Sequence, residues 1–135
     1  MNTLSAGLVY AALSFAIGAT LGPVRELALA PRIGGLPAAI LEAGAMAALL
    51  WLAAHLVLAR LEPPPTPRSR AVVAGLAVGC VVALEVALGI ALDATGLAAN
   101  RPPRGGAEQA IGLALLLWLA ILPFLVRRGH AVAVP

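Results

Sequence analysis

Four long apolar stretches, joined by short connectors rich in proline, glycine and arginine, make up most of this 135-residue sequence. They cover residues 4–22, 36–59, 71–92 and 109–126. A helix needs about 20 residues to cross the hydrocarbon core of a bilayer, and each stretch is apolar all round rather than along one face. We therefore predict an all-α integral membrane protein, in which four spans pack as one four-helix bundle and residues 1–135 form a single transmembrane domain.

Charged residues are scarce, and this scarcity excludes several classes of protein. They make up 11% of the chain, whereas an ordinary soluble domain has about 25%. So few charges cannot cover a water-facing surface, which excludes a soluble enzyme and a nucleic-acid-binding module. All nine basic residues are arginine, so a lysine Schiff base and the lysine of a phosphate-binding P-loop are excluded as well.

The sequence contains no recognisable metal, cofactor or catalytic motif. His55 and His130 belong to different segments, and Cys80 is the single cysteine, whereas metal sites combine several ligands at short spacings. A nucleophile elbow and a glycine-rich phosphate loop are also missing from the sequence. We therefore expect no metal, no cofactor and no catalytic residue.

The arginines flank the four spans almost evenly. Five belong to the middle connector and the C-terminal tail, and four to the other two connectors: Arg60, Arg68, Arg70, Arg127 and Arg128, against Arg25, Arg32, Arg101 and Arg104. By the positive-inside rule, this excess places both ends of the chain in the cytoplasm. The first stretch lacks the basic region and the small-residue cleavage site of a secretory signal, so we expect it to be a span.

Two carboxyl groups are predicted to lie inside the membrane at a similar depth. At about 1.5 Å per residue, Glu42 lies about 9 Å from the start of its span, and Glu85 lies about 10 Å from the same side. An acidic side chain near the centre of a span costs about 2.5–3.5 kcal/mol, so a partner is expected. If the first helix continues through a kink at Pro23, Arg25 can reach both groups. We therefore predict a charge cluster of Arg25, Glu42 and Glu85.

The alternative interpretation gives these residues a structural role. Glu42 would then be hydrated near the headgroups, Arg25 and Glu26 would form a solvated pair, and Glu85 would be protonated and hydrogen-bonded as a packing device. Other charged or titratable residues near the spans provide secondary candidates for a site, namely Glu26, Arg32, Asp93 and His55.

Two pairs of glycines have the spacing that lets membrane helices pack closely. They are Gly18 with Gly22 in the first span and Gly75 with Gly79 in the third. Residues 49–53 also match residues 116–120 in sequence. This match indicates either two parallel helical hairpins related by duplication or a coincidence in a chain dominated by alanine and leucine.

One stretch of the chain resembles a known group of proteins. Residues 18–27 (GATLGPVREL), residues 31–34 (PRIG) and Glu42 resemble a loosely defined group of small bacterial inner-membrane proteins with four predicted spans. The resemblance covers about the first third of the chain. It implies a location in the bacterial inner membrane, and it implies no activity.

Three functional hypotheses follow from the sequence. The first is an accessory, assembly or scaffold protein that packs in a homo-oligomer or a larger membrane complex, because small residues dominate its helix faces. The second is an oligomeric carrier or channel coupled to protons or ions, in which Glu42 and Glu85 bind the cation. The third, an enzyme acting on lipid or quinone, is the weakest because no catalytic set supports it. The expected partners are the lipid bilayer and other membrane chains, and nucleic acid is not among them.

Overall fold

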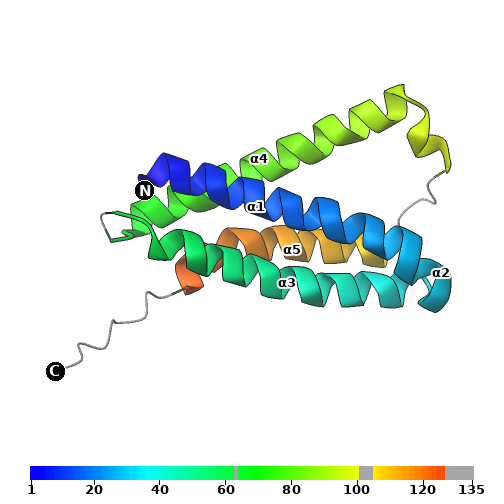
Figure 1. Ribbon diagram of the computed structural model, residues 1–135, viewed down its shortest axis with the longest axis horizontal. Helices are drawn as coiled ribbons and strands as arrows, with labels where there is room; N and C mark the ends of the chain where they lie inside the picture. The colour runs from blue at the N-terminus through cyan, green and yellow to red at the C-terminus, as the bar shows by residue number, and fades with distance from the viewer. Residues whose placement is uncertain (63, 101–104, 127–135) are drawn as a thin grey trace.

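A computed structural model describes residues 1–62, 64–100 and 105–126, and all regular secondary structure in these ranges is helical (Figure 1). Four of its helical segments are long and apolar enough to cross a membrane, as the sequence predicts. The long helices are α1 (Thr3–Val24), α3 (Gly35–Ala59), α4 (Pro67–Ala94) and α5 (Gly106–Leu125). Three short helical segments accompany them: a π-helical turn (Arg25–Leu29), α2 (Ala30–Ile33) and a 3₁₀ turn (Leu97–Asn100).

The first span continues well beyond residue 22, where the sequence places its end. Pro23 has no N–H to donate to the carbonyl of Ala19, but its ring fixes a helical φ, so the helix can pass through it. The next turn widens into the π-helical segment, in which the N–H of Ala30 donates to the carbonyl of Arg25. The helical path therefore runs over Thr3–Ile33. It ends at Gly34, whose φ of +90° is in the region that favours glycine.

Each long helix packs against two neighbours. α1 contacts α3 and α4, and α5 contacts the same two helices, so α1 lies diagonally opposite α5 and α3 opposite α4. The close approach of α1 to α4 depends on Gly7, because a Cβ atom at this position would lie 2.7 Å from Cδ1 of Leu76. A methyl group there would overlap the leucine, so only glycine fits without a shift.

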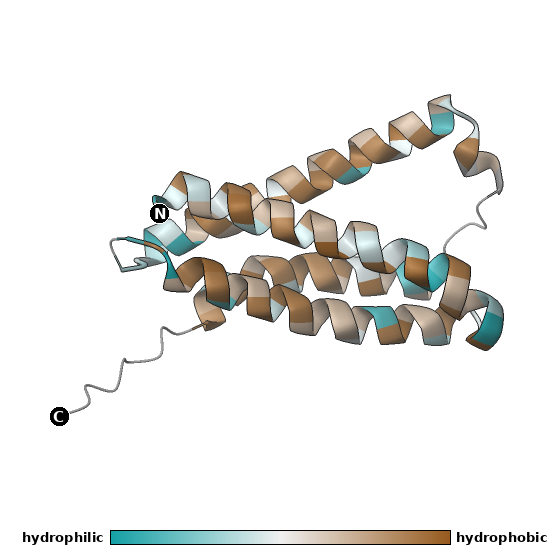
Figure 2. Cartoon of the chain, viewed as in Figure 1, coloured by the Kyte–Doolittle hydropathy of each residue, from teal (hydrophilic) through white to brown (hydrophobic). Residues whose placement is uncertain are grey.

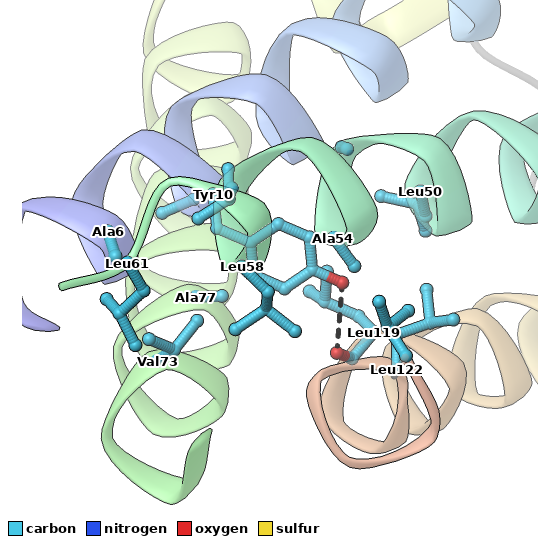
Figure 3. Close-up of a cluster of buried hydrophobic side chains, with 14 of the residues drawn as sticks. Ala6, Tyr10, Leu50, Ala54, Leu58, Leu61, Val73, Ala77, Leu119 and Leu122 are labelled. Carbon is cyan, nitrogen blue, oxygen red and sulfur yellow. Dashed lines mark hydrogen bonds between the residues drawn. The ribbon is translucent and has the colours of Figure 1, made fainter. Parts of the chain in front are cut away.

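The buried core lies toward the end where the first residues meet the connector between α3 and α4. The N-terminal amine of Met1 donates to the carbonyl of Arg60 over 3.1 Å at this end. The largest side chains that are fully buried include Tyr10, Leu58 and Leu122, which come from α1, α3 and α5 (Figure 3). This half of the protein is therefore the closely packed half.

Pro123 shapes the end of α5 and its contacts with two other helices. Because Pro123 cannot donate to the carbonyl of Leu119, that oxygen is free to accept a hydrogen bond from the hydroxyl of Tyr10, at 3.3 Å (Figure 3). Arg70 of α4 donates from Nη1 to the carbonyl of Pro123, and over 2.7 Å to the carbonyl of Val126. These bonds satisfy carbonyls that the end of a helix leaves without an intrahelical donor.

The other half of the protein is more open. The C-terminal half of α4 leads away from the remaining helices before the 3₁₀ turn (Figure 1). Hydrophobic residues make up most of all four long helices (Figure 2). Large apolar side chains are exposed on each of them, for example Leu8 at 55%, Leu52 at 45%, Ile90 at 65% and Leu117 at 62%.

Candidate functional site

A cavity of about 740 Å³ lies in the open half, and residues of all four long helices line it. Its floor is formed by Ser14, Leu50, Val81 and Leu119, each of which is buried. The hydroxyl of Ser14 donates to the carbonyl of Tyr10 over 2.7 Å, one turn nearer the packed core. The cavity is therefore closed toward the packed half.

Most of the cavity wall is aliphatic, but five ionisable residues contribute to it. They are Arg25, Glu26, Glu42, Glu85 and Glu108. The guanidinium of Arg25 and the carboxyl of Glu26 come from the π-helical turn. The other three carboxyl groups come from α3, α4 and α5. Four carboxyl groups and one guanidinium thus share one cavity, which gives it an excess of acidic groups.

Arg25 is held between two of these carboxyl groups. Its Nε lies 3.3 Å from Oε2 of Glu42, and its Nη2 lies 3.3 Å from Oε1 of Glu26. The side chains of Arg25 and Glu42 are only 13% and 15% exposed. Gly22 lies beside this pair, since a Cβ atom at this position would be in ordinary contact with Oε1 of Glu42, at 3.9 Å. The helical path through Pro23 thus brings the arginine to the carboxyl of α3.

Glu85 lines the same cavity but stands apart from Arg25. It is an exposed residue of α4, and its carboxyl group makes neither a hydrogen bond nor an ion pair with the rest of the described chain. The divergence of α4 explains this separation (Figure 1). The structure therefore brings Arg25 and Glu42 into direct contact, and places Glu85 at the same cavity without direct contact with the arginine.

Glu108 is a cavity residue that the sequence analysis did not select. Its Oε1 lies 2.9 Å from the position that a Cβ atom would take at Gly35, the first residue of α3. Glu108 is also in the first turn of α5. Two helix N-termini are therefore close to this carboxyl group. An acidic residue just after the Gly105-Gly106 turn is the sequence feature that could have identified it.

The secondary candidates lie in different places. Glu26 pairs with Arg25 at the cavity, whereas Arg32 is exposed in α2 and Asp93 is exposed near the end of α4. Neither Arg32 nor Asp93 lines the cavity. His55 stacks on Trp51 of the same helix, with ring centroids 5.5 Å apart. It lies beyond Leu50, the last cavity residue of α3, and thus in the packed half.

The two glycine pairs also differ. A Cβ atom at Gly18 would lie 3.4 Å from Cε of Met46, so the first pair supports packing of α1 on α3. Gly75 and Gly79 are exposed, and an added Cβ atom would have nothing within 4 Å in either place. The second pair therefore makes no helix contact within the described chain, and its expected packing role is absent there.

The two matched tryptophans occupy different environments. Trp118 donates from Nε1 to the carbonyl of Ala47 over 3.1 Å, which links α5 to α3. Trp51 is 49% exposed and stacks on His55. The sequence match between residues 49–53 and 116–120 is therefore not accompanied by matching contacts of these side chains.

Chelation of a metal ion finds no support among the described residues. They contain no group of three histidine, cysteine or acidic residues placed to hold a metal ion. The carboxyl groups around the cavity thus do not form one such ligand set. They are suited to separate contacts with a larger cationic molecule, or to binding protons.

Comparisons with protein-family models, with curated proteins and with solved structures find no match. The resemblance to small inner-membrane proteins stays a prediction from the sequence.

Proposed function

We propose that this chain is an integral membrane protein that spans the bacterial inner membrane four times as a four-helix bundle. The exposed apolar side chains of all four long helices support this placement, because acyl chains cover such a surface better than water does. Met1 and Arg60 meet at one end of the protein. This end carries the connector with the larger number of arginines, so we assign it to the cytoplasm.

Within the membrane, the geometry best supports a carrier that couples protons or small cations, working as a homo-oligomer with the acidic cavity as its binding site. The observation that carries this proposal is the presence of four carboxyl groups and one guanidinium around one cavity of about 740 Å³. Acidic side chains within a span are costly and usually functional. A proton or a cation would neutralise the excess carboxyl groups.

The residues around the cavity suit different roles in such a carrier. Glu85, which lacks a pairing partner within the described chain, is the proposed site of proton or cation exchange. Arg25 and Glu42 form a pair with little exposure, so the arginine is suited to fix the carboxyl of α3 and to lower its affinity for a cation. Because the floor at Ser14 and Leu119 is buried, a cation would reach the cavity only from the open half.

The proposal can be tested in liposomes that contain a pH-sensitive dye. Imposed gradients of sodium or potassium are expected to move protons through the wild-type protein. Glu85→Gln should abolish this movement, and Glu42→Gln should reduce it. Asp93→Asn is the matched control, because Asp93 is on the same helix as Glu85 but does not line the cavity. If no cation moves protons, or if both α4 variants behave alike, the carrier proposal is wrong.

An accessory or scaffold role is the second candidate, and the exposed glycine pair of α4 favours it. Gly75 and Gly79 leave open space on the outside of the protein, where the helix of another membrane chain could approach closely. Purification in mild detergent followed by mass spectrometry tests this role. A stoichiometric partner that is lost in Gly75→Leu, together with the absence of cation-driven flux, would favour it over the carrier.

A further inference from the structure

The acidic cavity has an opening to which exposed residues of α4 and α5 contribute. Leu88 of α4 and Leu113 of α5 both line the cavity, and they are nevertheless 47% and 68% exposed. Gly89 and Gly112 lie beside them in the lining, and an added Cβ atom would meet nothing within 4 Å at either position. The opening is therefore apolar and unobstructed, on the side where α4 diverges (Figure 1).

The size and lining of the cavity suit an organic cation better than a bare ion. Its volume of about 740 Å³ is in the range of about 300–1,000 Å³ that is typical of small-molecule sites. Aliphatic side chains such as Met46, Leu92 and Leu116 separate the carboxyl groups, and Phe15 is the single aromatic residue of the lining. Such a wall favours a flexible alkyl chain over a stacked aromatic ring.

We infer that the cavity binds an amphipathic alkyl amine, which enters from the lipid through the flank between α4 and α5. The ammonium group binds at Glu85, and the alkyl chain lies along the leucines of α5. This inference depends on the proposed membrane placement and on the proposed role of the cavity as a binding site. It follows from the combination of a carboxyl group without a partner inside the cavity and an apolar opening beside it. A bare ion would need no such opening.

The test compares probes on the full chain in nanodiscs of zwitterionic lipid, with affinities corrected for partition into empty nanodiscs. Octylammonium is expected to bind more tightly than methylammonium, because the alkyl chain adds apolar contacts. Octyl sulfate, which has the same chain and an anionic head, should not bind. Glu85→Gln should weaken octylammonium binding about tenfold or more, which is the usual effect of losing a charged hydrogen bond. Equal binding of octyl sulfate would refute the inference.

Filling the opening provides a second, independent test. Gly112→Leu and Gly89→Leu place a side chain in the opening, and both positions have the space for it. Either variant should slow the association of octylammonium severalfold. Gly75→Leu is the matched control, because this residue of α4 is exposed and does not line the cavity. Circular dichroism identifies the variants that fold, and only these are compared.

The outcomes separate this inference from the carrier proposal. If small cations move protons in a manner that depends on Glu85, but octylammonium does not bind, the amine inference is wrong and the carrier remains. If octylammonium associates equally fast with the wild type and with both filled variants, entry through the flank is wrong. If no cation of either kind binds or moves protons, both proposals are wrong.

Discussion

Replacing Tyr10 with phenylalanine removes one hydroxyl group and leaves the fully buried ring in place. The hydroxyl donates to the carbonyl of Leu119, which lacks its normal helical donor because residue 123 is proline. The oxygen atoms are 3.3 Å apart, about 0.5 Å longer than a typical O–H···O bond. We therefore expect Tyr10→Phe to lower the free energy of unfolding by about 0.5–1 kcal/mol, close to values for single hydrogen bonds between membrane helices.

Pro123→Ala supplies the matched background for this experiment. Alanine restores an N–H that can donate to the carbonyl of Leu119, so the hydroxyl of Tyr10 is no longer needed there. In this background, Tyr10→Phe should cost close to nothing. Both costs can be measured by unfolding in mixed micelles with increasing sodium dodecyl sulfate, followed by circular dichroism. Equal costs in the two backgrounds would refute the view that the tyrosine compensates for the proline.

Two further predictions concern the packing of α1 and the ion pair at the cavity. Gly7→Ala should lower the free energy of unfolding by about 1–3 kcal/mol, because its methyl group would lie 2.7 Å from Leu76, whereas Gly75→Ala should change it by less than about 0.5 kcal/mol. Glu42→Gln should cost about 1–2 kcal/mol, between the values for exposed and buried pairs. In an Arg25→Gln background, Glu42→Gln should lower the free energy of unfolding by less. An equal loss in both backgrounds would show that the two residues are not coupled.

The number of long helices could be predicted from the sequence because length and hydropathy are local properties. Each apolar stretch is long enough to form a span without reference to its neighbours. The face of the first helix on which Arg25 lies could also be predicted, since helical spacing places Gly18, Gly22 and Arg25 near one face. The sequence could not predict whether the helix continues past Pro23, because proline can end a helix or only bend it.

The sequence could not predict which face of each helix packs against the neighbouring helices. Gly18 and Gly22 have the same spacing as Gly75 and Gly79, but only the first pair faces a neighbouring helix within the described chain. In a stretch that is apolar all round, the sequence pattern does not mark an inner face. The separation of Glu85 from Arg25 could not be predicted either, because it depends on the divergence of α4 from the other helices.

The difference between the two halves of the protein follows from the side chains that point inward. In the packed half, small residues such as Ala6 and Ala77 let the helices approach until Tyr10 and Leu122 are fully buried. In the open half, four carboxyl groups and one guanidinium lie among the aliphatic side chains that line the cavity. Burying an unpaired carboxylate against apolar side chains is costly, so these helices cannot pack as closely without a neutralising group. The same acidic groups that prevent close packing are thus the ones that the carrier proposal assigns to cation binding.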